Sequence, residues 1–297
     1  MLELNLAYPE KSHIDFQLSS YPDGQHNVLI KEFKKVNMDN NIIIKSRFNS
    51  FEDLEKIACA AKALRRKGFD SLYLFIPYLL GARSDKIGKT GEPNYLVDVV
   101  APFLNLLNFK EIQCMDVHSN VAAACIPNLV SYDNSELVHW ALEDLATGKG
   151  TEYKEYLKNG FVFISPDAGS LTKIYHMADQ LFYTNGFVIC SKYRDWEGKL
   201  SRVDVPVQGK ELAYGSKDFI IVDDICDGGR TFVNISKELI RAMGGMKAGK
   251  TYLIVTHGIF SAGFEELYKH FDGIYCTNSY SDISNRDQNK LKQTDIF

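Results

Sequence analysis

Short apolar runs alternate with helix-like stretches along the chain, and this rhythm constrains the fold more than any other feature of the sequence. Strand-like runs occur at Asn41–Ser46, Ser71–Pro77, Glu111–Asp116, Phe161–Ser165, Gly186–Cys190, Phe219–Asp223, Lys250–Thr256 and Gly273–Thr277. Helical spacing of apolar residues occurs at 51–67, 95–107, 135–145, 169–181, 231–243 and 261–270. Repeated strand–helix–strand units predict an α/β fold with largely parallel sheets and right-handed crossovers.

The segment Thr147–Thr151 contains two glycines and is the best candidate for a domain boundary. The strand–helix alternation begins again after it, and a length of 297 residues suggests two domains. We therefore predict an N-terminal domain over 1–146 and a C-terminal domain over 147–297. The similar rhythm of the two halves predicts two domains of related design.

Charge and composition argue against several classes of protein. The chain has 34 Lys and Arg against 38 Asp and Glu, a formal net charge of −4, whereas a dedicated nucleic-acid binder needs a basic surface. The apolar runs are shorter than the roughly 20 residues that span a bilayer, and Met1–Lys11 lacks the pattern of a signal peptide. Six scattered cysteines include no CxxC pair, which argues against a zinc ribbon. We expect a cytoplasmic protein without nucleic-acid or membrane partners.

Polar residues directly follow six of the apolar runs. These segments are Arg83–Lys86, Asp116–His118, Ser165–Gly169, Lys192–Arg194, Asp223–Asp224 and Thr256–Gly258. Ligands of open α/β sheets bind beyond the carboxyl ends of the strands. We therefore expect the functional site among these segments.

The most informative segment is Phe219–Phe232, which reads FIIVDDICDGGRTF. An apolar run leads to two adjacent acids, then to a Gly-Gly turn and to Thr231 at the predicted start of a helix. Glycines and a helix N-terminus together turn backbone N–H groups toward an anion. The carboxylates can accept hydrogen bonds from sugar hydroxyls or hold Mg²⁺. The alternative is an ordinary β-turn and helix cap made by Asp227 and Thr231, but two acids ending an apolar strand are costly without ligands.

The segment resembles the phosphoribosyl-diphosphate loop of type I phosphoribosyltransferases and of ribose-phosphate diphosphokinases (PRPP synthetases). Six further segments are similar to the diphosphokinases in order and spacing, from about residue 20 to residue 295. They are Tyr21–Gln25 (YPDGQ), Ile76–Lys86 (IPYLLGARSDK), Met115–His118 (MDVH), Ser165–Gly169 (SPDAG), Lys192–Arg194 (KYR) and Thr256–Ser261 (THGIFS). This resemblance implies two related type I phosphoribosyltransferase-like domains, each a mainly parallel sheet flanked by helices.

Members of that family transfer the β,γ-diphosphoryl group of ATP to the 1-hydroxyl of ribose 5-phosphate and release AMP. The resemblance therefore implies a Mg²⁺-dependent enzyme that uses ATP and assembles as a homo-oligomer, a dimer or a hexamer. Phosphoryl chemistry of this kind depends mainly on positioning and charge neutralisation.

The resemblance also implies roles for individual residues. Lys192 and Arg194 would stabilise charge at the transferred phosphorus, and the loop 195–203 would close over the substrates. His118 and Asp167 would bind Mg²⁺ or its waters. Asp223 and Asp224 would bind the ribose hydroxyls. The phosphate loop would comprise Asp227, Gly228, Gly229, Arg230 and Thr231, and ATP would be contacted by Arg83, Ser84, Asp85, His118, Gln25 and, from a neighbouring subunit, Tyr21 and Asp23.

The phosphate loop departs from the family pattern D-T-G-G-T, because Gly228 replaces its threonine and Arg230 replaces a glycine. The missing side chain opens space, and an arginine offers a bidentate grip on phosphate oxygens. This combination suits an acceptor whose 5-phosphate continues into a larger group, such as the diphosphate of ADP-ribose. Enzymes resembling PRPP synthetases act on ADP-ribose in viral pathways that rebuild NAD, which would place this chain in a host cytoplasm.

Two other functions stay open. In the first, Arg230 points to solvent and the acceptor is ribose 5-phosphate. In the second, the chain is a non-catalytic regulator like the PRPP-synthetase-associated proteins. Gln25 stands where the family has a glutamate and Ser84 where it has a glutamine, so the preferred nucleotide also stays open.

Overall fold

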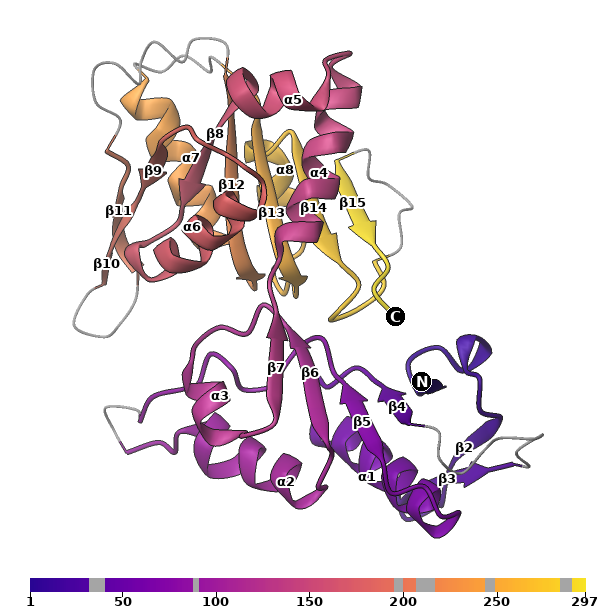
Figure 1. Ribbon diagram of the computed structural model, residues 1–297. Helices are drawn as coiled ribbons and strands as arrows, with labels where there is room; N and C mark the ends of the chain where they lie inside the picture. The colour runs from indigo at the N-terminus through magenta and orange to yellow at the C-terminus, as the bar shows by residue number, and fades with distance from the viewer. Residues whose placement is uncertain (32–40, 88–90, 195–199, 207–216, 244–248, 284–289) are drawn as a thin grey trace. The chain divides into compact units, whose positions relative to one another are not determined.

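All described strands of the two large sheets run parallel, as the strand–helix rhythm predicts (Figure 1). The computed structural model describes residues 1–31, 41–87, 91–194, 200–206, 217–243, 249–283 and 290–297. The chain divides into an N-terminal unit, Met1–Tyr132 together with Phe297, and a C-terminal unit, Asp133–Ile296. The predicted α/β class is confirmed in both units.

The N-terminal unit is built on a five-stranded sheet of order β1-β4-β5-β6-β7. The strands are β1 (Leu2–Asn5), β4 (Ile42–Lys45), β5 (Leu72–Phe75), β6 (Glu111–Met115) and β7 (Leu129–Tyr132), with a short 3₁₀ turn at Pro9–Lys11. The helices are α1 (Phe51–Arg66), a π-helix at Tyr95–Val100 that continues as α2 (Ala101–Leu106), and α3 (Val121–Cys125). A separate antiparallel hairpin, β2 (Phe16–Ser20) and β3 (His26–Ile30), packs its apolar side chains into the same core.

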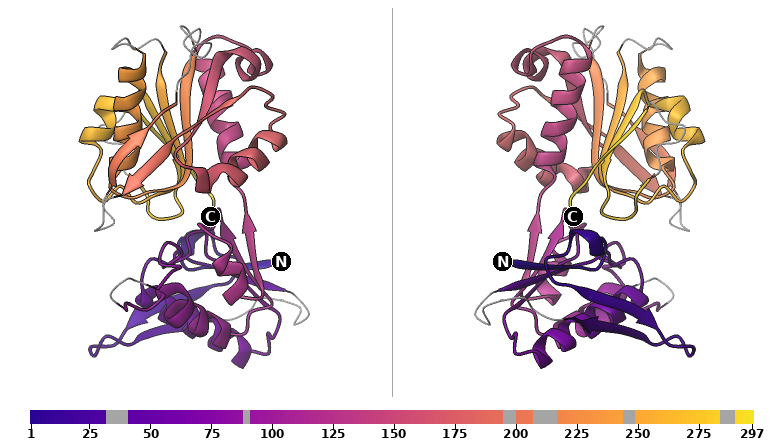
Figure 2. Two further views of the ribbon diagram at one scale, coloured as in Figure 1. Left: turned by 90° about the vertical axis from the view of Figure 1, so that its left-hand side faces the viewer. Right: turned by 90° about the vertical axis from the view of Figure 1, so that its right-hand side faces the viewer.

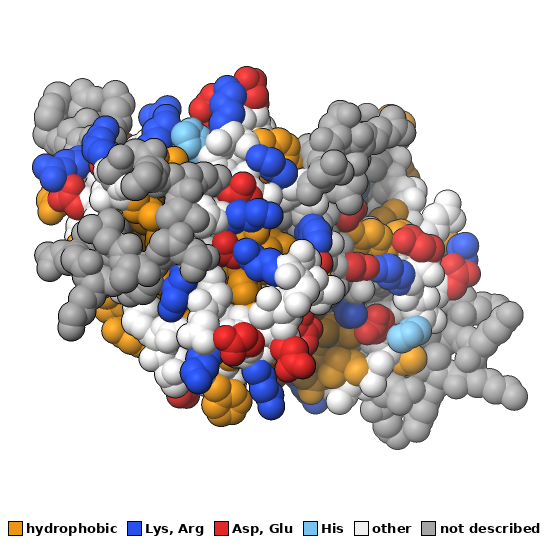
Figure 3. Space-filling view, turned by 90° about the horizontal axis from the view of Figure 1, so that it is seen from above, with side chains coloured by type: hydrophobic (Ala, Val, Ile, Leu, Met, Phe, Trp, Pro, Cys, Tyr) orange, Lys and Arg blue, Asp and Glu red, His pale blue; other side chains and the backbone are white. Residues whose placement is uncertain are grey.

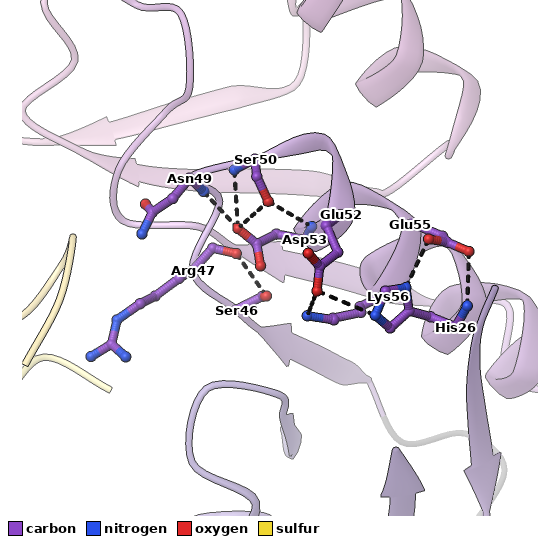
Figure 4. A network of polar contacts seen from close by, with 9 residues as sticks. All are labelled: His26, Ser46, Arg47, Asn49, Ser50, Glu52, Asp53, Glu55 and Lys56. Carbon is purple, nitrogen blue, oxygen red and sulfur yellow. Dashed lines mark hydrogen bonds and ion pairs between the residues drawn. The ribbon is translucent and has the colours of Figure 1, made fainter. Parts of the chain in front are cut away.

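The start of α1 carries a network of polar contacts that also fixes the hairpin (Figure 4). The Asp53 backbone N–H donates to Ser50 Oγ, and Asp53 in turn accepts from the Ser50 backbone N–H, which completes a capping box. On the first two turns of the same helix, Glu52 and Glu55 contact the ring of His26, with the His26 Nδ1 to Glu55 Oε2 distance at 2.8 Å. Strand β3 is thereby tied to α1.

The C-terminal unit is built on a six-stranded sheet of order β15-β14-β13-β12-β8-β9. Its strands are β8 (Phe161–Ser165), β9 (Phe187–Ile189), β12 (Asp218–Cys226), β13 (Thr251–Gly258), β14 (Gly273–Thr277) and β15 (Leu291–Thr294). A two-stranded antiparallel ribbon pairs β10 (Ser191–Arg194) with β11 (Leu200–Asp204). The helices are α4 (Ser135–Gly148), α5 (Tyr153–Glu155) with a π-helical turn at Tyr156–Gly160, α6 (Leu171–Gln180) after a 3₁₀ turn at Ala168–Ser170, α7 (Arg230–Ala242) and α8 (Glu265–His270).

Both faces of this sheet are buried, which explains why its strands are continuously apolar. Phe161, Phe163, Ile220 and Ile254 pack on one face with residues of α4 and α6. The alternate positions of the same strands pack on the other face with residues of α7 and α8; they include Val162, Ile164, Phe219, Ile221, Leu253 and Val255. Figure 2 shows the sheet between these two layers of helices.

The strand order of the C-terminal unit reverses between β8 and β12. The chain leaves β8 through α6 to β9 on one side, whereas β12, β13, β14 and β15 follow one another on the other side. In open α/β sheets, such a reversal leaves a crevice at the carboxyl ends of the two strands, where ligands bind. The segments that follow β8 and end β12 are therefore the place to look for a site.

The predicted domain boundary at 146/147 differs from the structure, which divides the chain between Tyr132 and Asp133. Thr147 lies inside the last turn of α4. Helix α4 belongs to the C-terminal unit because its apolar face, with Val138, Ala141 and Leu142, packs on that sheet. The two glycines of 147–151 therefore end a helix and do not mark a linker.

Two predicted helices also differ in detail. The stretch 95–107 begins as a π-helix, and Pro102 near the start of α2 has no N–H to donate to the turn before it. The stretch 261–270 is helical only from Glu265, because Gly263 adopts a left-handed φ of 72°. The short strands β1, β2, β3, β7, β10, β11 and β15 were not predicted.

The first residue of β12, Asp218, is only 1% exposed and ties three elements together. Its Oδ2 lies 2.7 Å from the Tyr156 hydroxyl, which donates to it, and 2.9 Å from Lys149 Nζ. Its Oδ1 accepts from the Lys250 backbone N–H at 3.1 Å. A buried carboxylate is stable when its oxygens are paired in this way.

Charged side chains of both signs lie side by side on the face shown in Figure 3. Exposed ion pairs such as Lys269 with Glu265 and Glu266 contribute little to stability. Within the described part of the chain, no helix has the length and apolar character that crossing a bilayer requires.

We expect the substitution Asp218→Ala to lower the free energy of unfolding of the C-terminal unit by about 3 kcal/mol, because it leaves Lys149 and the Tyr156 hydroxyl without their buried acceptor. Urea denaturation followed by circular dichroism measures this change. Lys269→Ala, which removes an exposed pair, is the matched control and should leave the midpoint unchanged. Equal midpoints for Asp218→Ala and the wild type would contradict the prediction.

Candidate functional site

Strand β12 is longer than its neighbour β8, so the acid pair lies beyond the last residue that pairs with β8. The two strands pair from Asp218 opposite Phe161 to Ile221 opposite Ile164. Beyond that point β12 continues beside β13 alone, with Asp223 opposite Val255. Asp223 and Asp224 therefore lie where β8 has already turned into its loop, and they face the segment that carries Asp167.

Asp167 follows β8 and accepts hydrogen bonds on both carboxylate oxygens. Oδ1 accepts from the Ser170 backbone N–H at 3.0 Å, and Oδ2 accepts from Lys192 Nζ at 2.7 Å. Burial alone would raise the pKa of Asp167, but the hydrogen bonds and charge of Lys192, with the help of Ser170, lower it below its usual value. Asp167 is therefore an ionised carboxylate paired with the side chain of Lys192.

Ser170 joins Asp167 to the acid pair. Its hydroxyl lies 3.2 Å from Asp167 Oδ1 and 3.4 Å from Asp223 Oδ1, so it can donate to either. Asp223 Oδ1 also accepts from the Asp224 backbone N–H at 3.0 Å. Burial and the adjacent Asp224 carboxylate raise the pKa of Asp223, and the charge of Lys192 only partly opposes this rise.

Asp224 is the more buried of the two acids, with 6% of its side chain exposed. Lys173, on the first turns of α6, places its Nζ 3.3 Å from Asp224 Oδ2. Two lysines from different elements thus pair with two of these carboxylates: Lys192 of β10 with Asp167, and Lys173 of α6 with Asp224.

The loop after β12 is a glycine turn that leads directly into a helix. Gly229 has a φ of 73°, and a Cβ there would come within 2.9 Å of the Leu267 side chain, so the turn requires glycine. Helix α7 starts directly after it at Arg230. The Ser261 hydroxyl donates to Asp227 Oδ1 at 2.5 Å and holds the loop from the side. Gly228 and Arg230 are exposed, and Thr231 is half-buried.

The remaining predicted residues fall in three places. The backbone of Arg194 lies in β10, and its side chain and residues 195–199 of the predicted closing loop lie outside the described structure. In the N-terminal unit, Arg83, Ser84 and Asp85 follow β5, and His118 follows β6, its neighbour in the sheet. The Met115 backbone N–H donates to the Pro77 carbonyl at 2.9 Å, so the two segments leave the same edge together.

Tyr21, Asp23 and Gln25 lie in the turn of the β2–β3 hairpin, and all three are exposed. The Tyr21 backbone N–H donates to the Gln25 carbonyl at 2.8 Å, and Gly24 supplies the positive φ of the turn. This hairpin belongs to a different sheet from the strands that precede Arg83 and His118. The exposed turn is consistent with a contact to another subunit, which stays a prediction.

Among the described residues, no three His, Cys, Asp or Glu side chains converge into a ready-made metal site. Magnesium in nucleotide enzymes typically uses one or two carboxylates together with substrate phosphates and water. The ionised, oxygen-bearing Asp167 fits such a role, because one carboxylate beside a polyphosphate is sufficient.

The sequence motifs did not include Ser170 and Lys173. They lie three and six residues after Asp167, on the turns where the chain enters α6. A polar residue at that spacing, directly after a strand-end acid, is the signal that could have found them. The partner of Lys173 could not be found in this way, because Asp224 is on a different strand.

The sequence of this chain is similar to those of several ribose-phosphate pyrophosphokinases. No family model matches it. The ribose-phosphate pyrophosphokinase of Thermococcus kodakarensis is 28% identical over 270 residues, 90% of this chain and 86% of the relative. That of Pyrococcus furiosus is 26% identical over 91% of this chain and 88% of the relative, and ribose-phosphate pyrophosphokinase A of Dictyostelium discoideum is 26% identical over 87% and 73%.

A solved structure, phosphoribosylpyrophosphate synthetase from Mycobacterium smegmatis, shares the fold with a TM-score of 0.73 at 18% identity. The match covers 97% of this chain and 88% of the other. These comparisons confirm the resemblance that the sequence motifs indicate and the predicted fold of two α/β domains. They do not identify the substrate that would accept the diphosphoryl group.

We expect Asp223→Asn to be more stable than the wild type at neutral and alkaline pH. The pKa of Asp223 is raised in the folded state, so folding costs increasing free energy as the pH rises from about 4, its unfolded-state pKa, toward the raised value. An asparagine has no such cost. The difference in melting temperature should therefore vanish near pH 4 and grow as the pH rises, measured by thermal unfolding at several pH values. A difference that does not change with pH would contradict this assignment.

Proposed function

We propose that this chain, a homologue of the ribose-phosphate pyrophosphokinases, is a diphosphotransferase that moves the β,γ-diphosphoryl group of ATP to the 1-hydroxyl of a ribose 5-phosphate acceptor. The observation that carries the proposal is the grouping of Asp167, Lys192 and the Asp223–Asp224 pair beside a glycine turn at the carboxyl edge of one sheet. The reaction needs carboxylates that accept hydrogen bonds from the sugar hydroxyls, a turn that binds the phosphate, and a cation that stabilises charge on the transferred group.

The acceptor would be held at two points. Asp223 and Asp224 accept hydrogen bonds from the 2- and 3-hydroxyls of the ribose. The backbone N–H groups at Gly228–Thr231 and the N-terminus of α7 receive its 5-phosphate. Binding at both ends fixes the direction of the sugar ring and presents its 1-hydroxyl.

In the reaction, the acceptor 1-hydroxyl oxygen forms a bond to the β-phosphorus of ATP. The bond from that phosphorus to the oxygen bridging it to the α-phosphorus breaks, AMP leaves with the electron pair, and the hydroxyl proton passes to solvent water. Lys192 brings positive charge to an edge rich in carboxylates and would stabilise the charge that spreads over the transferred group. We assign Arg194 the same role.

Asp167 would hold Mg²⁺ on the carboxyl edge of the C-terminal unit. A magnesium role for His118, in the N-terminal unit, stays a prediction. When bound, the ion neutralises charge on the polyphosphate. Arg83, Ser84, Asp85 and the hairpin turn with Tyr21, Asp23 and Gln25 are assigned to ATP.

A second candidate acceptor is ADP-ribose, which carries a larger group on its 5-phosphate. Gly228 is exposed, and a Cβ built on it would have no atom closer than the Ser261 Oγ at 3.8 Å. Arg230 is exposed at the first position of α7. Open space next to a guanidinium favours a diphosphate over a compact monoester.

We expect Lys192→Met to lower kcat for AMP release at least about 100-fold, because it removes a positive charge from the transferred group. Purified protein is incubated with ATP, Mg²⁺ and either ribose 5-phosphate or ADP-ribose, and AMP is quantified. Lys154→Met, at an exposed lysine of α5, is the matched control and should match the wild type. Absence of AMP with both acceptors in the wild type would overturn the enzyme and favour the non-catalytic regulator.

We expect Arg230→Gly to lower kcat/KM for ADP-ribose relative to ribose 5-phosphate by about tenfold, the loss of one charge-assisted contact with the second phosphate. The same assay measures this ratio. A wild type that uses ribose 5-phosphate alone refutes the larger acceptor and leaves the diphosphotransferase in place.

A further inference from the structure

Lys173 is the cation of the site whose contribution no sequence motif indicates. It enters from α6, and its Nζ lies 3.3 Å from Asp224 Oδ2. The two side chains differ in exposure, 35% for Lys173 against 6% for Asp224. The acid is therefore inside the protein, while the lysine reaches it from the edge of the sheet.

We propose that Lys173 is a positioning residue for the acceptor: it orients the Asp224 carboxylate so that this acid and Asp223 together accept the vicinal hydroxyls of a ribose. This proposal rests on the proposed function and adds a determinant of acceptor binding to it. Lys173 acts through Asp224 and is not assigned a contact with the reacting atoms.

The first argument is the cost of two adjacent buried acids. Asp223 and Asp224 are consecutive residues on β12, and each raises the free energy of ionising the other. Lys192 lies at Asp167, so its charge is shared with a third carboxylate. A second cation next to Asp224 makes it possible for both acids to remain acceptors, which hydrogen bonding to two sugar hydroxyls requires.

The second argument is the direction of Lys173. Strand side chains alternate between faces, so Asp224 is on the same face of β12 as Val222, which packs with α6. Lys173 belongs to that helix, in the turn that also contributes Ile174 to the core. Lys173 therefore contacts Asp224 from the side of α6, whereas Asp223 contacts Ser170 in the loop after β8.

The third argument is a small cavity of about 10 Å³ beside the pair. Its lining combines Lys173, Ser170, Asp223 and Asp224 with apolar atoms of Met177 and Val222. The space is sufficient for about one water molecule, and the polar groups around it can bind one. A carboxylate with room next to it can adjust to a sugar hydroxyl while its contact with the lysine orients it.

The weaker geometry of this pair also fits positioning. The Lys173–Asp224 distance is 3.3 Å, whereas the Lys192–Asp167 distance is 2.7 Å. The longer contact can orient the Asp224 carboxylate while its oxygens still accept a hydrogen bond from a sugar hydroxyl. Removing the lysine should therefore affect acceptor binding and leave the chemical step and ATP binding intact.

The test uses the full chain with Lys173→Met, Lys173→Arg and the control Lys237→Met, an exposed lysine on α7. For Lys173→Met we expect KM for the acceptor to rise about tenfold, the effect of one charge-assisted hydrogen bond. KM for ATP and kcat should stay within about twofold of the wild type, because the reacting atoms are untouched. Lys173→Arg should restore acceptor KM, and Lys237→Met should change nothing.

A double-mutant cycle separates positioning from a structural role. The dissociation constant of ribose 5-phosphate or ADP-ribose is measured by calorimetry in the presence of a non-hydrolysable ATP analogue. In an Asp224→Asn background, Lys173→Met should cause no further loss, because its effect passes through that carboxylate. Circular dichroism confirms that each variant is folded, and Lys173→Arg provides the comparison if Lys173→Met unfolds.

The outcomes are distinct. An unchanged acceptor KM in Lys173→Met, an equal rise in KM for ATP, no rescue by Lys173→Arg, or losses that add in the cycle would each overturn the positioning role while the enzyme stands. A wild type that neither binds an acceptor nor releases AMP overturns the proposed function and this proposal with it.

Discussion

The candidate site depends on a difference in length between two strands: β12 continues past the end of β8, so its two acids lie where β8 no longer pairs with it. The other side chains of the site contact these two acids or lie beside them. The loop after β8 supplies Asp167 and Ser170, and two lysines come from α6 and β10. The same continuation of β12 leads into the glycine turn before α7.

Two of the three carboxylates of the site are paired with a lysine, and the third is not. Asp167 has a lysine at 2.7 Å and Asp224 has one at 3.3 Å, whereas Asp223 is served by a hydroxyl and a backbone N–H. Burial and the neighbouring Asp224 carboxylate raise the pKa of Asp223, and the charge of Lys192 only partly offsets this rise. A carboxylate with a raised pKa is expected where a site accepts hydrogen bonds from a ligand. The buried Asp218 at the opposite end of β12 shows the contrast, since its partners are all supplied by the protein.

Strands buried on both faces were predictable because each is a continuous apolar run; Phe161–Ser165 and Gly273–Thr277 match the structure in full. Short edge strands such as β15, with four residues and mixed burial, carry no comparable pattern. The boundary was misplaced for a related reason. Glycines at 148 and 150 are a local signal, whereas the membership of α4 is decided by the sheet that buries its apolar face.

The sequence by itself determined the chemistry available: acids at the end of an apolar strand, glycines before a helix, and lysines near other strand ends, all in an order that resembles one family. Only the tertiary structure decided the pairings. Lys192 meets Asp167 across 25 residues, Ser261 meets Asp227 across 34, and Lys173 meets Asp224 across 51. The order of the strands in the sheet and the path of the connecting helices bring these side chains together. Neither can be deduced from the order of residue types along the chain.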